Sequence, residues 1–255
     1  MLEKVSLGKS GIKVSKLGFG TGTHGISGAS VQTNLGADKF VKLLRYAYDK
    51  GISYWDTADS YGCHHYIADT LRGMNRSDVV IGTKTDSKTP MSVTNDINRF
   101  MSELRVNYLD ILLLHCVVNE NWLEDYKGAI EVLKEAKQNG LVKAIGISCH
   151  SFNVLQRVVE ADWVDVLLAR LNYASSFMDA SPDKVIPVLQ QIHDQGKGTV
   201  IMKVLGDGEL AQDPEKAINF ISELSCVDAI IIGMMDENQV NQNVQLVENV
   251  FTKVG

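Results

Sequence analysis

The stretch Ile52-Ser53-Tyr54-Trp55-Asp56 is an apolar, strand-like run that ends on an acid, and two later runs share this design. Residues 79–84 end on Lys84, and residues 111–115 end on His115. The three terminal residues are separated by 28 and 31 positions, close to the roughly 30 residues of a βαβ unit. Because parallel strands place their carboxyl ends at one rim, this spacing predicts that the three side chains converge.

Tyr61 lies five residues after Asp56, within Asp56-Thr57-Ala58-Asp59-Ser60-Tyr61-Gly62. A free tyrosine has a pKa of about 10, and a nearby ammonium lowers that value. We expect Lys84 to supply this charge, Asp56 to pair with Lys84, and His115 to hydrogen-bond a substrate oxygen or relay a proton. Each residue alone is more often solvated or salt-bridged, but their joint occurrence at matching strand ends favours protonation of an alkoxide forming on a carbonyl.

Length and composition narrow the class of protein. The chain has 255 residues, which matches a single (β/α)8 barrel of about 250 residues. A net charge of −6 gives no indication of a nucleic-acid surface. No apolar run reaches the ~18–20 residues that cross a membrane, and the first residues lack a signal-peptide core. We therefore expect a cytoplasmic protein, and its four cysteines, without CxxC spacing, to be free thiols.

Strand and helix patterns alternate along the chain. The expected strands are residues 16–19, 52–56, 79–84, 111–115, 142–147, 164–169, 199–204 and 229–232. Helical periodicity covers residues 38–50, 130–138, 154–159, 185–192 and 240–250, and helix starts are expected to be capped at Ser92, Ser151 and Asp213. Eight βα units predict an α/β fold, a (β/α)8 TIM barrel built as one domain over residues 1–255. The alternative is an open doubly wound sheet, but the strand–Gly-x-Gly-x-x-Gly–helix fingerprint is absent.

A short β-hairpin is predicted before the barrel, because residues 4–7 and 13–15 flank the turn Lys9-Ser10-Gly11. Residues 7–15, 17–21 and 140–148 resemble the N-terminal hairpin, first strand and fifth strand of the aldo-keto reductase family. The Asp56–Gly62 segment, with Lys84 and His115, resembles the catalytic tetrad of the same family. The hairpin is then expected to close the bottom of the barrel.

The resemblance implies hydride transfer from a nicotinamide cofactor to an aldehyde, ketone or sugar carbonyl, or oxidation of the alcohol. Tyr61 would be the general acid, Lys84 would tune it, Asp56 would pair with Lys84, and His115 would orient the carbonyl. Two alternatives remain open, a redox-neutral sugar epimerase-type enzyme that retains its cofactor and a non-catalytic nucleotide-sensing barrel. The intact tetrad favours an enzyme acting on a small molecule.

The resemblance also implies cofactor contacts, several of them altered here. The expected cofactor-binding residues are Gly20, Thr21, Ser148, Cys149, Asn172, Met202, Lys203, Gly233, Met234, Gln239 and Asn243. Ser148 keeps a hydroxyl for the nicotinamide carboxamide, whereas Cys149 replaces an Asn of the family and is a weak hydrogen-bonding partner. Leu168 replaces a Gln. Met202 replaces an aromatic residue that stacks on the ring.

Charge near the predicted phosphate sites distinguishes the two nucleotides. Lys203 either reaches an anionic group, such as the pyrophosphate, or pairs with an acid such as Asp207. Gly233-Met234-Met235 and Gln239 stand where the family usually places cations for the adenosine 2′-phosphate. Because a phosphate dianion binds poorly without a positive partner, the sequence favours NAD(H) over NADP(H).

The substrate side is expected to be open, or completed by a neighbouring subunit in a homo-oligomer. Trp122, in the short loop 116–123, is expected either to line the substrate pocket or to cover the barrel. The loop 21–37 is long, polar and rich in glycine. No metal is expected, because the histidines and cysteines near the rim lack ligand spacing. These residues are Cys63, His64, His65, Cys116, Cys149 and His150.

Overall fold

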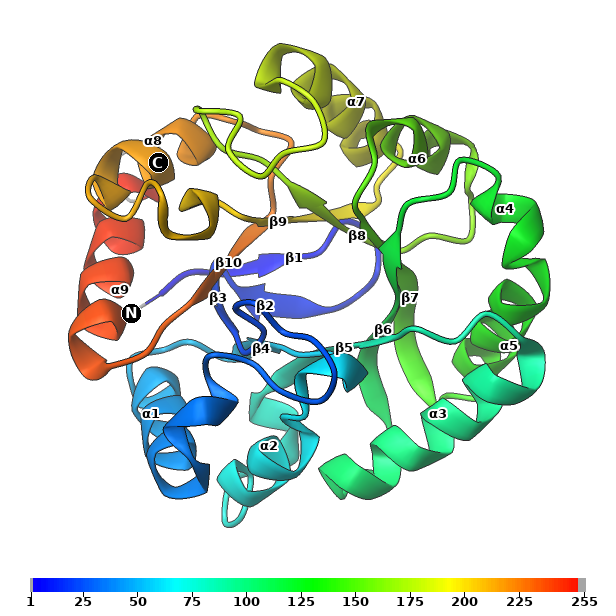
Figure 1. Cartoon of the computed structure of the whole chain (residues 1–255), viewed down its shortest axis with the longest axis horizontal. Coiled ribbons are helices and arrows are strands. Elements are labelled where there is room, and N and C mark those ends of the chain that lie inside the picture. The colour runs from blue at the N-terminus through cyan, green and yellow to red at the C-terminus, as the bar shows by residue number, and fades with distance from the viewer. Residues whose placement is uncertain (1, 252–255) are drawn as a thin grey trace.

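The computed structural model describes residues 2–251 and shows a closed barrel of parallel strands surrounded by helices (Figure 1). The strands follow one another around the barrel in chain order, and the last closes on the first. They are β3 (Leu17–Gly20), β4 (Tyr54–Asp56), β5 (Val80–Thr85), β6 (Leu109–Val117), β7 (Val142–Cys149), β8 (Val166–Arg170), β9 (Gly198–Met202) and β10 (Ala229–Gly233). The predicted TIM barrel is confirmed, and no described helix is long and apolar enough to span a membrane.

The helices form the outer layer. They are α1 (Ala37–Asp49), α2 (His64–Thr70), α3 (Pro90–Leu104), α4 (Trp122–Asp125), α5 (Lys127–Gln138), α6 (Phe152–Arg157), α7 (Pro182–Asp194), α8 (Pro214–Ser222) and α9 (Glu237–Phe251). Short 3-10 helices add η1 (Thr33–Leu35), η2 (Asp59–Tyr61), η3 (Arg76–Asp78), η4 (Val158–Glu160) and η5 (Gly206–Gly208). The predicted domain also includes Met1 and residues 252–255, which lie outside the described part of the chain.

The observed helix caps agree with the sequence prediction for α8 and differ from it for α6 and α3. Asp213 caps α8 by accepting a hydrogen bond from the Lys216 amide, as expected. Ser151 precedes α6 but makes no side-chain cap bond. Ser92 is wrong as the cap of α3, because Pro90 already fits the first turn and Thr89 is the cap. Ser92 instead completes a capping box with Thr89.

Strand alternation creates two apolar cores. Outward side chains pack against the helices. Inward side chains form a smaller core inside the barrel, made of Leu7, Ile12, Val14, Tyr54, Ile111, Leu113, Ala144, Val166, Leu168, Val200, Ala229 and Ile231. Three of these come from the N-terminal hairpin of β1 (Lys4–Ser6) and β2 (Lys13–Ser15). The hairpin therefore plugs one end of the barrel, as expected.

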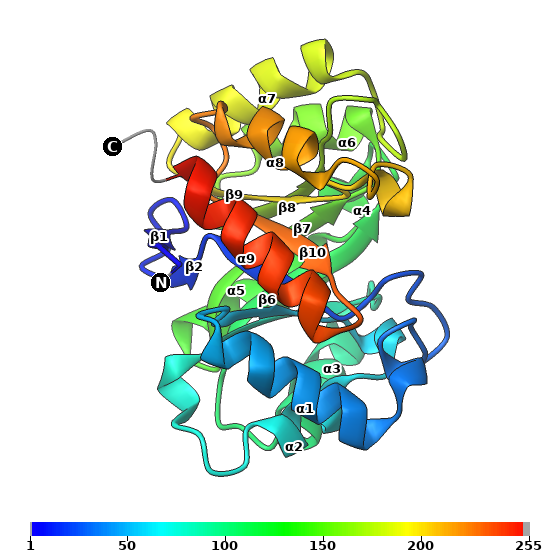
Figure 2. The same ribbon diagram turned by 90° about the vertical axis from the view of Figure 1, so that its left-hand side faces the viewer.

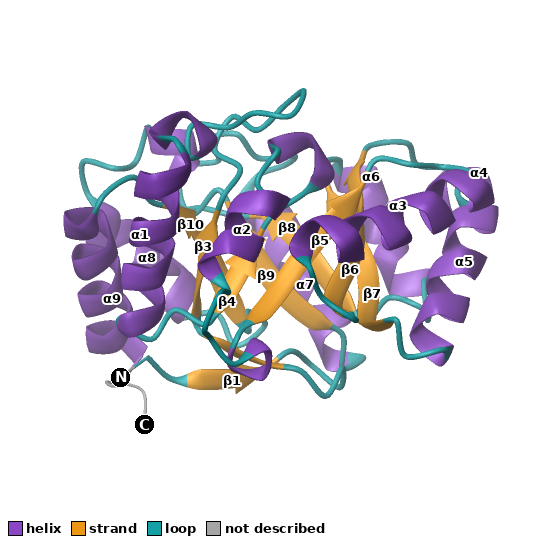
Figure 3. Ribbon diagram, turned by 90° about the horizontal axis from the view of Figure 1, so that it is seen from below, coloured by secondary structure: helices purple, strands orange, loops and turns teal. Residues whose placement is uncertain are grey.

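The plug and the long loops lie at opposite ends of the molecule (Figures 2 and 3). At the plug end, the Lys9 amide donates to the carbonyl of Gly196 at 2.7 Å, next to the start of β9. Gly8 has φ +48°, and a Cβ there would lie 2.3 Å from the same carbonyl oxygen. This approach of two backbones requires glycine. The carboxyl ends of the strands stay free for a site.

Replacing Leu7 by Ala should lower the free energy of unfolding by about 2–5 kcal/mol, because it leaves a cavity between plug and barrel. Leu7 is fully buried. Urea unfolding measures the loss, with Ser6→Ala, at an exposed position of the same hairpin, as the control. Equal effects of the two substitutions would show that the hairpin is not part of the core.

Candidate active site

The last inward-facing residues of the strands form a ring at the mouth of the barrel. In β8, Val166 and Leu168 belong to the inner core and Leu167 and Ala169 to the outer one, so Arg170 points inward. The same alternation gives the other members of the ring. They are Gly20, Asp56, Lys84, His115, Ser148, Met202 and Gly233. The three strand-end residues of the sequence prediction are therefore neighbours on one rim.

Lys84 and Asp56 form a buried ion pair. Lys84 is 1% exposed, and its Nζ donates to both Asp56 carboxylate oxygens at 2.8 Å and to the Thr57 carbonyl at 2.7 Å. An ammonium has three donors, so these acceptors satisfy it completely. Burial raises the pKa of Asp56, and the positive charge of Lys84 opposes that rise. The pair joins β4 to β5 beneath the reacting position.

Tyr61, on η2, lies directly above this pair. The Lys84 Nζ is 5.1 Å from the centroid of the phenol ring, and the hydroxyl is 3.3 Å from His115 Nε2. The expected lowering of the Tyr61 pKa is wrong for this arrangement. Burial, followed by the negative charges of Asp56 and Asp86, raises the pKa of Tyr61. Because Lys84 is already neutralised by Asp56, Tyr61 is a neutral phenol at physiological pH.

Asp86 orients His115 and was missed by the sequence analysis. His115 Nδ1 lies 2.9 Å from Asp86 Oδ1, and this hydrogen bond holds the pKa of Asp86 below its usual value. Donation from Nδ1 leaves Nε2 facing Tyr61, so Asp86, His115 and Tyr61 form a hydrogen-bonded series. A signal was present in the sequence, because Asp86 follows Lys84 by two residues and alternation puts both on one side of the strand.

The loop between β3 and α1 covers Tyr61 with glycines. A Cβ on Gly22 would lie 2.1 Å from the Tyr61 ring, and one on Gly25 would lie 2.2 Å from it. The Thr21 amide and hydroxyl both donate to the Asp56 carbonyl, at 2.9 and 3.0 Å. The glycine-rich composition therefore allows the backbone to approach the Tyr61 ring closely at two positions.

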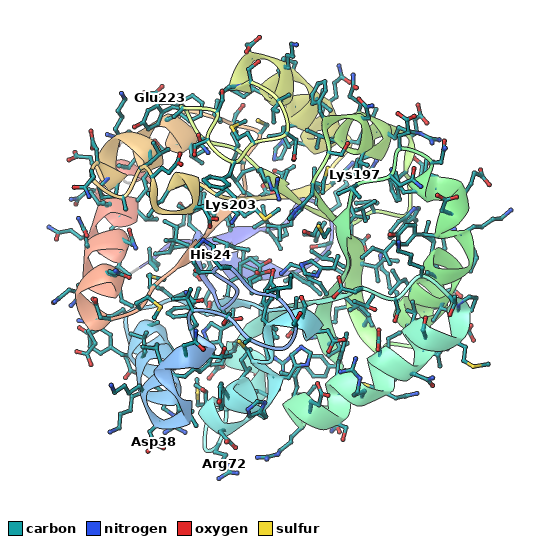
Figure 4. The ribbon with its side chains drawn as sticks, viewed as in Figure 1. His24, Asp38, Arg72, Lys197, Lys203 and Glu223 are labelled. Atoms are coloured by element: carbon teal, nitrogen blue, oxygen red, sulfur yellow. The ribbon has the colours of Figure 1, made fainter. Side chains whose placement is uncertain are left out.

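A second loop meets the first across the mouth. His24 Nε2 lies 3.1 Å from Asp207 Oδ2, and Lys203 Nζ lies 2.6 Å from Asp207 Oδ1. Figure 4 shows His24 and Lys203 near the centre of the barrel mouth. Of the two roles left open for Lys203, the structure shows the pairing with Asp207.

Backbone strain gathers at this mouth. Eight described non-glycine residues have positive φ, and only Arg105, which ends α3, lies away from the rim. The seven others are His24, Ser27, Cys116, Ser175, Phe177, Lys203 and Asp207. Strained backbone of this kind is typical of functional sites.

Ser148 and Met202 fit a nicotinamide. Ser148 Oγ is buried and has no hydrogen-bond partner among the described residues, so it is available to a carboxamide. Met202 is partly buried against the inner core. This part of the rim can hold the ring of the expected cofactor.

Several other side chains expected to contact the cofactor have partners within the protein. The Asn172 side chain makes all its hydrogen bonds with backbone groups of residues 174, 176 and 203. Cys149 points into the outer core and donates to the Ser151 carbonyl, and the Thr21 hydroxyl is bound to the backbone of Asp56. Met234 is fully buried. These residues support the rim rather than present polar groups to a ligand.

The region expected to bind adenosine has no cation of its own. Gly233 and Gln239 are exposed, and Gln239 Oε1 accepts a hydrogen bond from the Met235 amide. Asn243 is buried on α9. Residues 233–243 contain two acids and no Lys, Arg or His.

The prediction that Trp122 lines a substrate pocket is wrong. Its side chain is fully buried and packs edge-on against Trp163, with ring centroids 5.9 Å apart. Trp122 begins the short helix α4, which turns the indole into the outer core. Trp122 therefore covers the barrel, which was the other expected role. Phe177 is an exposed aromatic residue at the rim.

A cluster of ionisable groups next to the site serves as an anchor. Asp59, His64 and Glu103 place ligand atoms within 4.8 Å of one another. Arg99 already occupies this position, 2.6 Å from Asp59 and 3.1 Å from Glu103. The cluster fastens η2, and with it Tyr61, to α3.

Comparison with known proteins identifies the family. The model of the aldo/keto reductase family matches residues 16–225. This chain belongs to the aldo/keto reductase family. It is 24% identical to the uncharacterized oxidoreductase YqkF of Bacillus subtilis, over 84% of this chain and 70% of that protein. It is 25% identical to L-galactose dehydrogenase of Arabidopsis thaliana, over 83% of this chain and 68% of that enzyme.

The fold agrees with this assignment. The holo form of an aldo-keto reductase from Bacillus halodurans superposes with a TM-score of 0.79 at 22% identity, covering 97% of this chain and 91% of that one. At this identity the likeness concerns the barrel, while the chemistry depends on the residues of the aldo-keto reductase rim described above.

Replacing Gly22 by Ala should destabilise the protein by about 1–3 kcal/mol, because the methyl group overlaps the Tyr61 ring. In a Tyr61→Ala background the same substitution should cost almost nothing. A double-mutant cycle of unfolding free energies measures the difference. An equal cost in both backgrounds would show that the loop does not pack on Tyr61.

The pH dependence of stability should report on His150. Burial, followed by the positive charge of Arg170, lowers the pKa of His150 to about 3, against about 6.5 in an unfolded chain. Between these values the unfolded state binds more protons, so stability is full above pH ~6.5 and falls as pH drops towards 3. His150→Gln should flatten the fall of Tm between pH 7 and 4.5, whereas His65→Gln, at an exposed position, should not. Parallel curves for all three proteins would contradict this prediction.

Proposed function

We propose that the protein is a nicotinamide-dependent carbonyl reductase, which reduces an aldehyde, ketone or sugar carbonyl and can oxidise the corresponding alcohol. The observation that carries this proposal is the convergence of Tyr61, His115 and the Lys84–Asp56 pair at the barrel mouth, with distances of 3.3 Å between Tyr61 and His115 and 2.8 Å within the ion pair. Membership of the aldo/keto reductase family supports it.

The residues divide the proton chemistry among them. A nicotinamide cofactor, when bound, would provide the hydride for the carbonyl carbon. Tyr61, kept neutral by its raised pKa, donates its proton to the oxygen, where negative charge develops. His115, oriented by Asp86, lies 3.3 Å from the Tyr61 hydroxyl through Nε2 and positions that hydroxyl. Lys84, paired with Asp56, lies against the phenol ring and holds it in position.

We propose NAD(H) as the preferred nucleotide. Ser148 would bind the carboxamide and Met202 would pack against the nicotinamide ring. The absence of any cation from residues 233–243 removes the usual partner of a 2′-phosphate, which a dianion needs for tight binding. Asn172, Cys149 and Thr21 are engaged elsewhere, so fewer side chains hold the cofactor than the family pattern implied.

Fluorescence titration with NADH and NADPH tests the cofactor. NADH should bind at least tenfold more tightly than NADPH. Equal affinity would refute the preference, and no affinity for either nucleotide would refute the oxidoreductase. A barrel that binds nucleotide but never turns over free cofactor would support the sensing or the redox-neutral alternative.

Tyr61→Phe tests the acid. The kcat for reduction of butanal should fall by about 10²–10⁴-fold, since a general acid contributes that much, while NADH affinity stays within about threefold. Tyr46→Phe is the matched control, because the Tyr46 hydroxyl lies at the surface and binds Asn241. A near-normal rate in Tyr61→Phe would remove Tyr61 from this role.

A further inference from the structure

A cluster of polar side chains continues the rim beyond His115. Arg170, the last inward residue of β8, contacts His150 Nδ1 through Nη2 and lies 3.1 Å from Asp179 through Nη1. Its side chain is 21% exposed, and its buried Nε has no hydrogen-bond partner among the described residues. A guanidinium has five N–H donors, so donors remain for a ligand in the mouth.

This cluster is joined to the catalytic residues through β6 and β7. Cys116 directly follows His115, and its Sγ lies 3.3 Å from His150 Nδ1. The pairing of β6 with β7 shifts register between Leu114 and Val117, and Cys116 has φ +49° at this irregularity. The irregularity places a small side chain between His115 and His150. His115 lies near the end of β6 and Arg170 ends β8, and these strands are separated in the barrel by β7 alone.

The cluster offers hydrogen-bond donors that an anion can use. Arg170 is permanently charged, and Asp179 meets it through a single oxygen rather than a bidentate fork. Burial raises the pKa of Asp179, and the positive charge of Arg170 opposes that rise. His150 accepts from Arg170 at Nδ1, so its proton lies on Nε2 and the ring is a further donor.

We propose that Arg170 and His150 bind a carboxylate of the substrate, so that the enzyme acts on carbonyl compounds that carry an acid group at some distance from the reacting carbon. This inference rests on the proposed carbonyl reduction at Tyr61. A carboxylate is planar and accepts two parallel hydrogen bonds, which suits a guanidinium. Asp179 then acts as the counter-charge that the incoming anion competes with.

Two matched pairs of probes test the preference. Succinic semialdehyde and butanal differ in a terminal carboxylate, and D-glucuronate and D-glucose differ in the same way at greater length. The protein should show a higher kcat/KM for the acid of at least one pair. Arg170→Gln should reduce this preference about 10–100-fold, the usual value of a hydrogen bond to a charged group.

Asp179→Asn should change the affinity for a carboxylate in the opposite direction to Arg170→Gln. Removing the counter-charge should strengthen binding of succinate several-fold, whereas Arg170→Gln should weaken it at least tenfold, both measured by calorimetry on the full chain. If the Arg170–Asp179 pair only holds the loop before α7, both variants weaken binding or neither changes it, and the inference is overturned. The double variant Arg170→Gln with Asp179→Asn leaves no unpaired buried charge and controls for folding.

The experiment also separates this inference from the proposed function. Arg170-dependent binding of succinate without turnover of any probe would sustain the carboxylate site and refute the reductase. Turnover of the probes without preference for the acids would sustain the reductase and refute the carboxylate site. If Arg170→Gln instead weakens NADH binding and leaves the acid preference unchanged, the guanidinium binds the cofactor pyrophosphate and the substrate assignment is wrong.

Discussion

The buried ion pair between Lys84 and Asp56 is the interaction on which the site depends. An ammonium inside the barrel mouth is tolerated only because three acceptors surround it at 2.7–2.8 Å. Removing either partner of such a pair leaves an uncompensated buried charge, which typically costs about 3–5 kcal/mol. The pair fixes the ends of β4 and β5 relative to each other. Tyr61 packs against this pair. The positive charge of Lys84 lies against the Tyr61 ring without a direct bond to the hydroxyl.

Around this pair the protein accepts local strain to hold its catalytic groups. Gly22 and Gly25 bring backbone against the Tyr61 ring, while the Arg99 cluster holds η2 from the outside. Residues with positive φ are concentrated in the loops above, where the plugged and densely packed lower barrel can support them. The chemistry thus stands on a rigid floor and under a constrained cover, a division that TIM barrels use widely.

The two halves of the site differ in how fully they are built. In the half that we propose to handle the proton, Asp86, His115 and Tyr61 form one hydrogen-bonded series next to Lys84. The cofactor half has an available hydroxyl at Ser148 but commits several other polar groups to the fold. In the function that we propose, fewer side chains hold the cofactor and the Arg170 guanidinium binds the substrate. Recognition by charge can then contribute specificity that the cofactor contacts do not.

The sequence by itself determined the barrel, the hairpin and the grouping of Asp56, Lys84 and His115, because alternation and the spacing of βα units are local properties of the chain. Only the tertiary structure decided which polar groups are free. The burial of Trp122 follows from contacts between segments far apart in sequence, as does the saturation of Asn172 by surrounding backbone. The same reason explains why the Tyr61 pKa rises instead of falling. Spacing places groups on a rim, but their protonation and availability depend on the neighbours that folding brings to them.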